Sequence, residues 1–380
     1  MMPVVRKYAK WMLALAIFCA IGATYVRAEH DEQDRKTIAA MTERMKTVCV
    51  GRFLIDLPED ARVSMKMTNL DGFDITRDVE SADQFARWIA QRESKLRAAP
   101  NMLGRDNIEL NKEIRGPNSS GRIFVHTRYR SNGIQRGRRV YHETVTIEAH
   151  LNRDGATYSF KSEGDAPERV AVVMSMMSQL VRLHDEVPNS HGFCLDGAFI
   201  AGSPVKHRHE SVTMFASLPR HPDATLAFWT NTGMHQVPGL LQRDIASTDA
   251  LTRMRSKTLR GGKRSIGGLS GEEVGVKTIE TNFTTNFSFA WETRGSDDNV
   301  FVPRLLVEFD TGISPRAGGE PVQSSLSEQM VLHLWERVSS SVRLRPAIPG
   351  GASEAADPPV VLDSTEPASV SVTAYTATRK

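Results

Sequence analysis

The chain repeats one layout twice, and each copy opens on a cysteine. The first copy begins with CVGRFLIDLP at residues 49–58 and the second with CLDGAFI at residues 194–200. Both runs are rich in strand-forming residues and stop at turn-forming Pro or Gly residues. A second strand is expected after each run, at residues 61–67 and 211–217. Because 380 residues is a length typical of about two domains, the chain predicts two domains of similar plan.

A helix is expected early in each copy. Apolar residues recur at helical spacing over residues 83–97, and Ser81 is a candidate N-cap. The corresponding region of the second copy, residues 238–257, has a weaker pattern, which predicts a helix broken near Ser247.

Alternating polar and apolar residues follow in each copy. Residues 144–151 show the period-two pattern of a half-buried strand, and residues 152–155 (NRDG) predict a hairpin turn. Because short turns connect antiparallel strands, each copy predicts a meander. The further strands expected in these meanders lie near residues 123–129, 158–160, 274–279, 287–291 and 305–309.

Each copy closes with an apolar helix. Pro167 stands near the start of the first, whose stripe extends to Val181, and a capping-box pattern at residues 325–328 (SLSE) begins the second. The methionine-rich stripe of the first could be a binding groove, but a sheet-packing helix needs one apolar stripe, so we interpret both as core. The fold class predicted is therefore α+β: two similar domains, each an antiparallel sheet meander packed with helices.

Composition changes along the chain predict the boundaries. The N-terminal domain is expected over residues 29–187 and the C-terminal domain over residues 188–346, with a linker at 184–191. Residues 347–380 have no apolar period and are rich in Pro, Gly, Ala and Ser, which predicts a disordered tail.

Residues 1–28 predict an export signal. A basic segment precedes a short apolar run, and Val26-Arg27-Ala28 resembles a cleavage site; an uncleaved membrane anchor is the alternative. Cleavage would remove four of the 48 basic residues and no acidic ones, leaving 44 against 45 and a net charge of −1. A near-neutral chain lacks the positive field that nucleic-acid binding needs, so no nucleic-acid partner and no stable membrane insertion after cleavage are expected.

The same cleavage removes Cys19 and leaves Cys49 and Cys194. In an oxidising compartment an even pair of cysteines favours a disulfide. In the chain-entropy model, a crosslink between these two positions would stabilise the folded state by at most roughly 5 kcal/mol. Two separate buried thiols are the alternative. The disulfide is the interpretation we favour.

No catalytic, metal or cofactor site is predicted. Ser203 and Lys206 fit a Ser-x-x-Lys pattern, but Gly202 and Pro204 predict a loop there, and no Lys-Thr-Gly partner motif is present in the sequence. His207, His209 and Glu210 lack the spacing of a metal motif, and a polar strand edge is the simpler interpretation. An envelope serine hydrolase of unknown substrate stays open as the alternative function. A solute-binding protein ranks last because it would need parallel sheets.

Three segments carry a family resemblance: CVGRFLIDLPEDARV at 49–63, HGFCLDGAFI at 191–200 and ESVTMFASLP at 210–219. They resemble the periplasmic immunity proteins that neutralise type VI secretion phospholipase effectors of the fourth lipase class. The resemblance implies a two-domain α+β inhibitor in the periplasm. Such a protein grips its cognate phospholipase with both domains like a claw, holds the effector's lid and keeps lipid from the active site. It further implies no enzymatic activity, no cofactor, and a monomer that forms a 1:1 complex.

The resemblance carries no short binding motif, so candidate contacts come from charged or aromatic residues expected at loop tips. These candidates are Arg136, Arg138, Arg139, Trp229, Arg260, Lys263 and Arg264.

Overall fold

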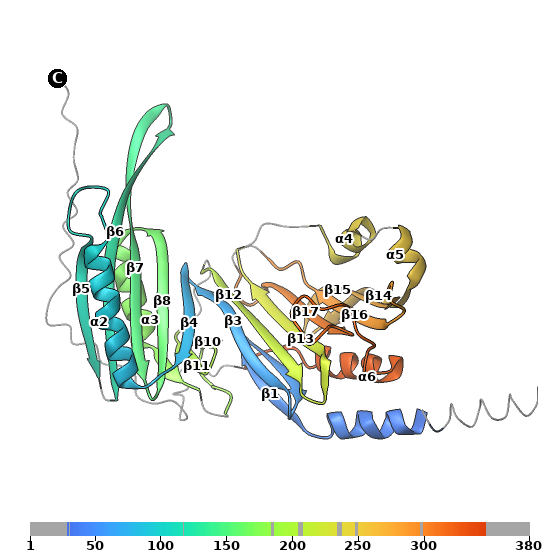
Figure 1. Ribbon diagram of the computed structural model, residues 1–380. Helices are drawn as coiled ribbons and strands as arrows, with labels where there is room; N and C mark the ends of the chain where they lie inside the picture. The colour runs from blue at the N-terminus through green and yellow to red at the C-terminus, as the bar shows by residue number, and fades with distance from the viewer. Residues whose placement is uncertain are drawn as a thin grey trace, which may run out of the picture.

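One antiparallel sheet of twelve strands runs through both halves of the molecule, in the order β14-β15-β16-β17-β13-β12-β3-β4-β8-β7-β6-β5 (Figure 1). The computed structural model describes residues 29, 31–116, 118–183, 186–203, 208–233, 238–247, 250–296 and 299–346. The predicted signal (1–28) and tail (347–380) lie outside these residues. Within them, no helix is long and apolar enough to span a bilayer.

The strands of the first half of this sheet are β3 (Arg62–Leu70), β4 (Phe73–Val79), β5 (Ile108–Gly116), β6 (Ser119–Gln135), β7 (Arg138–Arg153) and β8 (Ala156–Asp165). Those of the second half are β12 (Glu210–Leu218), β13 (His221–Asn231), β14 (Ser256–Ile266), β15 (Leu269–Ile279), β16 (Thr285–Glu292) and β17 (Arg304–Thr311). The two meanders predicted from the sequence are both present. They join where β3 pairs with β12, as in the register Met65↔Met214.

Two smaller sheets contain the cysteine-led segments. One has the order β1-β2-β18 and the other β10-β11-β9. Their strands are β1 (Met45–Val50), β2 (Phe53–Pro58), β9 (Leu180–Arg182), β10 (Gly192–Leu195), β11 (Ala198–Ala201) and β18 (Arg343–Leu344).

Each cysteine-led run, expected as one strand, is a tight hairpin. The first turns at Gly51, whose φ of +59° suits glycine, and the second turns at Gly197, with φ +64°. The prediction of single strands was therefore wrong, because a glycine inside each apolar run reverses the chain. The two hairpins meet through paired backbone hydrogen bonds between Gly51 and Cys194, of 2.9 and 2.8 Å.

Each hairpin packs with the other half of the chain. Strand β2 pairs with β18 through Leu54↔Arg343, beside the C-terminal helix, whereas β11 pairs with β9 through Phe199↔Val181. Figure 1 shows β1 beneath the second half of the sheet and β10 and β11 beneath the first. The boundary at 187/188 remains a prediction, and these exchanged hairpins cross it.

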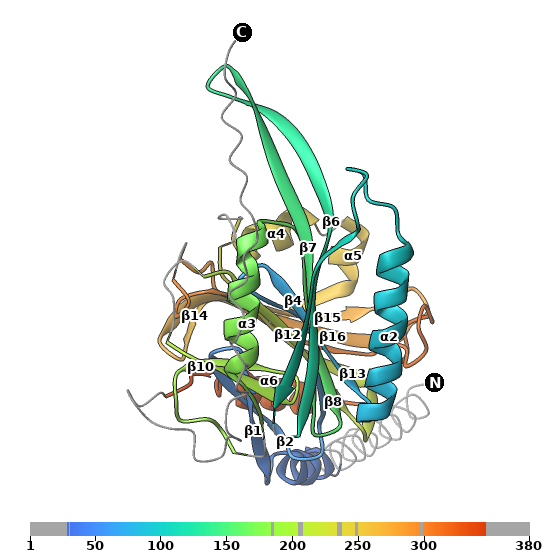
Figure 2. The same ribbon diagram turned by 90° about the vertical axis from the view of Figure 1, so that its left-hand side faces the viewer.

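The helices lie on both faces of the sheet. They are 31–42, α2 (Ala82–Ala98), the 3-10 turn η1 (Pro167–Arg169), α3 (Val170–Ser178), α4 (Leu240–Ser247), α5 (Ala250–Arg255) and α6 (Glu328–Ser339). The large core lies between one face of the sheet and α3, α6 and the small sheets; its largest buried side chains include Phe73, Phe160, Phe228, Phe309 and Trp335. On the other face, α2 packs Phe85, Ile89 and Leu96 against Phe124 (Figure 2).

Helix ends follow local chemistry. The predicted N-cap Ser81 forms a full capping box with Gln84, and the second-half helix breaks after Ser247 as expected. Helix α3 ends at Ser178, short of the predicted Val181, because β9 leaves to pair with β11. The N-cap of α6 is Ser327, since the Ser325 hydroxyl donates to Asp223 instead, so the predicted box at 325–328 was misplaced.

Candidate functional site

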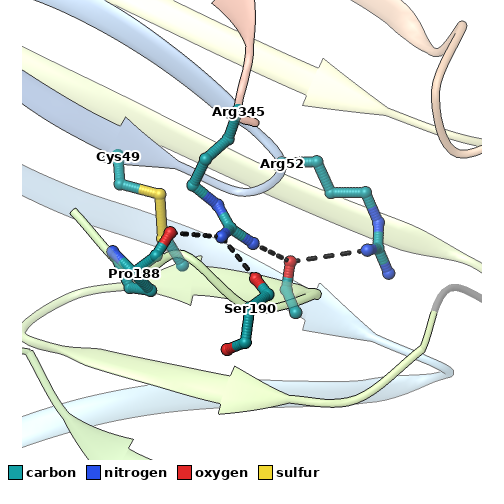
Figure 3. The surroundings of a disulfide bond; sticks show 7 residues. Cys49, Arg52, Pro188, Ser190 and Arg345 are labelled. Carbon is teal, nitrogen blue, oxygen red and sulfur yellow. Dashed lines mark hydrogen bonds between the residues drawn. A yellow bond between two sulfur atoms is a disulfide. The ribbon is translucent and has the colours of Figure 1, made fainter. Parts of the chain in front are cut away.

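A joint of five residues holds the two exchanged hairpins together: Cys49, Cys194, Arg52, Glu210 and Arg345. Figure 3 labels Cys49, Arg52 and Arg345 of this joint. Cys49 and Cys194 form a disulfide with Cα atoms 5.8 Å apart. The disulfide joins residues 145 positions apart in the chain, each of which lies in the first strand of its hairpin, close to the turn. This arrangement ties the two cysteine-led openings to each other rather than each to its own half.

Two buried arginines complete the joint. Arg52 donates from Nε and Nη2 to both carboxylate oxygens of Glu210, at 2.6 and 2.5 Å. Arg345 has no carboxylate partner among the described residues. It donates to the carbonyls of Pro188, Ser190 and Gly192, and its guanidinium lies 4.9 Å from the ring centre of Phe199. Burial, and then the charge of Arg52, lowers the pKa of Arg345 to about 10. These contacts can fix the position of the two hairpins relative to each other.

Opposite the core, the sheet has a face that the described helices cover only toward its ends, and it is called here the open face. Helix α2 packs on β6 and β7 at one end and α4 on β15 at the other. Between them, strands β3, β12 and β13 present Lys66, Phe215 and Trp229, which are all reached by solvent. A partner can therefore approach the middle of the sheet directly.

Trp229 lies in this open face, within β13, and not at a loop tip as the sequence had suggested. Its cross-strand neighbours are Thr213 and Leu306, and the guanidinium of Arg304 lies 5.2 Å from the ring centre. Arg304 in turn donates to the buried Glu292 at 2.6 Å. The indole is thus held in place by the sheet while one side remains accessible.

Two carboxylates of β17 share this face. Burial raises the pKa of Asp310, which accepts a hydrogen bond from Ser288, and burial together with the nearby Asp310 and Glu292 charges raises that of Glu308. Among the residues that the structure describes, no lysine or arginine pairs with either one. Neither was singled out from the sequence, because cross-strand neighbours cannot be read from spacing alone.

A second group of charges lies where α2 meets the sheet. Arg92 donates to both oxygens of the buried Glu148, at 2.9 and 2.6 Å, and the Nε2 atoms of His126 and His150 lie 3.5 and 3.6 Å from the same carboxylate. Burial raises the pKa of Glu148, but the imidazoles and Arg92 outweigh it and hold the pKa well below its usual range. A cavity of about 430 Å³ opens beside this cluster, lined on the α2 side by Trp88 and Lys95.

The predicted basic contacts fall in two distant places. Arg136, Arg138 and Arg139 lie at the tip of the β6–β7 hairpin, which projects beyond the rest of the sheet (Figures 1 and 2). Arg260, Lys263 and Arg264 were also expected at a tip, but they lie within the edge strand β14, and the turn is at Gly267-Gly268. Arg264 donates to Glu273 and Glu336, so this side chain already has partners within the fold.

The motifs considered for catalysis and metal binding do not assemble into a site in the described part of the chain. Glu210 is committed to Arg52, and His209 contacts Asn69 through Nδ1 at 3.0 Å. Lys206 and His207 lie outside the described residues. Within those residues, no group of His, Cys, Asp or Glu side chains could hold a metal ion.

Comparison with known proteins gives the family. Residues 46–172 match "Tle cognate immunity protein 4 N-terminal domain" and residues 186–347 match "Tle cognate immunity protein 4 C-terminal domain". No curated protein matches in sequence.

Solved structures agree with this assignment. The fold is similar to a chain of the Tle4–Tli4 complex, with a TM-score of 0.64 and 26% identity over 80% of this chain and 98% of that chain. It is also similar to the apo immunity protein TplEi of the type VI secretion system from Pseudomonas aeruginosa, with a TM-score of 0.62, 26% identity and the same coverages. Since the two domain matches lie in order and together span most of the molecule, the chain belongs to the Tle cognate immunity protein 4 family.

Proposed function

We propose that this immunity protein protects its producer by binding a type VI secretion phospholipase effector in the periplasm and keeping lipid from the effector's active site. Binding alone, without bond breaking by this chain, carries the protection. The related Tli4 is found in a complex with Tle4, which supports a protein partner of the same kind.

The observation that carries the proposal is the open face. A sheet buried on both faces would have nothing left to offer a partner. Here the middle strands expose Phe215 and leave Trp229 partly exposed, beside Glu308 and Asp310, which pair with no lysine or arginine in the described part of the chain. Aromatic side chains at the centre and charges around them are typical of protein interfaces. Desolvated carboxylates without a cation also favour a partner that brings lysine or arginine to this face.

Trp229 is the contact that we propose for the centre of the interface. A rigid indole held by the sheet loses little conformational freedom on binding, which is why tryptophan is frequent among residues that dominate affinity. Arg260 and Lys263, which are exposed on opposite faces of the edge strand β14, are proposed as peripheral contacts. Arg264 is expected to contribute less, because its partners lie within the fold.

The test is coexpression of an exported phospholipase effector, sought beside the gene of this chain, with and without the mature protein. We expect rescue of viability and a stable complex on gel filtration. Trp229→Ala should weaken the complex by roughly tenfold or more, whereas Phe283→Ala, which removes an exposed aromatic from the loop between β15 and β16, should not. Absence of both rescue and complex with the unmodified protein would disprove the function.

The serine hydrolase alternative makes a different prediction. Purified mature protein would turn over an ester substrate, and Ser203→Ala would abolish the turnover while leaving any complex intact. Rescue that survives Ser203→Ala, from protein without measurable turnover, is the result that the immunity function requires.

A further inference from the structure

The hairpin of β6 and β7 extends well past its neighbours in the sheet. Strand β5 pairs with β6 only as far as His126, and β8 pairs with β7 only from Val145 onward. Residues 127–144 are called here the arm. Apart from the Thr127 N–H, which donates to the Asn107 carbonyl at the base, its strand pairs lie within the ribbon, from Tyr129↔Thr144 to Gln135↔Arg138. Figure 2 shows the arm rising from the body of the protein as a two-stranded ribbon.

An isolated two-stranded ribbon is only marginally stable in water, and this one is secured at its base. Arg128 donates to both oxygens of Glu109 on β5, at 2.7 and 2.5 Å, and to Glu143 across the ribbon at 3.1 Å. Arg130 pairs with the same Glu143 carboxylate. These ion pairs hold the ribbon to the sheet edge while its outer part stays free.

The tip is a concentrated positive surface. The turn uses Arg136 and Gly137, both with positive φ (50° and 74°), the geometry of a tight two-residue hairpin. Arg138 and Arg139 follow at once, and residues 127–142 contain no Asp or Glu. In the part of the chain that the structure describes, the three tip arginines are exposed and make no ion pair.

One face of the arm combines this charge with apolar surface. The register places Ile134 opposite Arg139, and Tyr141 lies two residues along from Arg139 on the same face. Ile134 and Tyr141 are 78% and 63% exposed, although a soluble ribbon gains nothing from exposing them. Tyrosine, arginine and an aliphatic residue side by side are the composition of an interface centre.

We propose that the arm is a docking element for an acidic patch with an apolar centre on the phospholipase effector. The tip arginines attract the patch and speed the encounter, and Ile134 and Tyr141 then slow dissociation by burial. This inference rests on the proposed function, since it names the chemistry of that partner's surface. A lipid surface fits less well, because membrane-seeking loops place apolar side chains at the tip, whereas this tip is Arg-Gly-Arg-Arg.

The experiment measures association and dissociation of the mature protein with the phospholipase effector that the coexpression test identifies, at 50 and 300 mM salt. The charge variant carries Arg136→Gln, Arg138→Gln and Arg139→Gln. Its matched control removes three exposed arginines elsewhere, by Arg35→Gln, Arg316→Gln and Arg337→Gln. A separate variant carries Ile134→Ser and Tyr141→Ser, and all proteins are also sedimented with vesicles of phosphatidylglycerol and phosphatidylethanolamine.

We expect the charge variant to associate roughly tenfold more slowly at low salt, with a flatter salt dependence, while the control keeps both properties. The Ile134/Tyr141 variant should keep its association rate and dissociate roughly tenfold faster. Unchanged rates in both arm variants, alongside a normal wild-type complex, would overturn the inference and leave the proposed function intact. Arm-dependent sedimentation with vesicles, at unchanged effector rates, would assign the arm to the membrane and overturn it as well. A wild-type protein that binds no effector would overturn both proposals.

Discussion

The joint and the arm both rely on arginine, but they differ in what surrounds the guanidinium. In the joint, Arg52 and Arg345 are buried and bind groups of the same chain. Arg52 binds the Glu210 carboxylate, and Arg345 binds backbone carbonyl oxygens. In the arm, Arg136, Arg138 and Arg139 are exposed and form no ion pair with any residue that the structure describes. A buried charge strongly constrains the fold because an unpaired one is costly, whereas an exposed charge costs the fold almost nothing and is available to a partner. The difference separates residues that hold the protein together from residues that can find its target.

The largest expected effect comes from removing one partner of the buried pair. Glu210→Ala leaves Arg52 buried and uncompensated, which typically costs about 3–5 kcal/mol and should lower the urea midpoint strongly. The matched control is Glu59→Ala, which breaks the exposed pair with Arg44, at 3.0 Å, and should change stability by less than about 1 kcal/mol. Similar small losses in both variants would show that the joint is not what stabilises the molecule.

Loss of the disulfide is expected to come next. Cys49→Ser, Cys194→Ser and the double variant should each lose about 2–4 kcal/mol, and the double variant should be no worse than either single one. That equality follows because either change alone breaks the crosslink. Additive losses instead would indicate two independent buried thiols, and a mass that does not rise by two units on reduction would indicate the same.

A smaller, pH-dependent effect is expected at Glu148, which is as buried as the joint but is paired with Arg92, whose side chain is 30% exposed. Since its pKa in the folded protein is lowered below the ordinary 4.5, its contribution is present above that pH and declines as the pH falls toward the folded value. Glu148→Gln should therefore cost roughly 1–3 kcal/mol at pH 7, and the difference from wild type should shrink steadily below pH 4.5. A difference that stays constant from pH 7 to pH 3 would rule out the ionised carboxylate as its cause.

The sequence predicted features that depend on residues close together in the chain, and it did not predict features that depend on distant residues. The capping box at Ser81, the break after Ser247 and the meander strands depend on nearby residues, so spacing and turn chemistry predicted them. The exchange of the hairpins could not be predicted from the sequence, because it depends on pairings such as Leu54↔Arg343 between opposite ends of the chain. Glycine inside each cysteine-led run was the local signal that could have indicated a hairpin.

The candidate contacts show the same limit. Charge and glycine content led correctly to a hairpin tip at Arg136–Arg139, because the turn and its charges are adjacent in sequence. The same reasoning misplaced Arg260–Arg264, where the turn comes a few residues later, and Trp229, whose place in a central strand depends on β12 and β17. The Arg52–Glu210 pair, 158 residues apart, had no sequence signal at all.

The smallest expected effect on stability is at the arm, and it completes the comparison. The charge variant of Arg136, Arg138 and Arg139 should unfold within about 0.5 kcal/mol of wild type, because exposed side chains away from buried partners contribute little to folding. Removing three like charges from one ribbon also relieves their mutual repulsion, so any change should be slightly stabilising and should fade at high salt. Denaturant unfolding at 50 and 300 mM salt measures the stability change and its dependence on salt. If the variant loses as much stability as Glu210→Ala, then the tip arginines are part of the folded framework, and slower effector association could no longer be attributed to the contact surface alone.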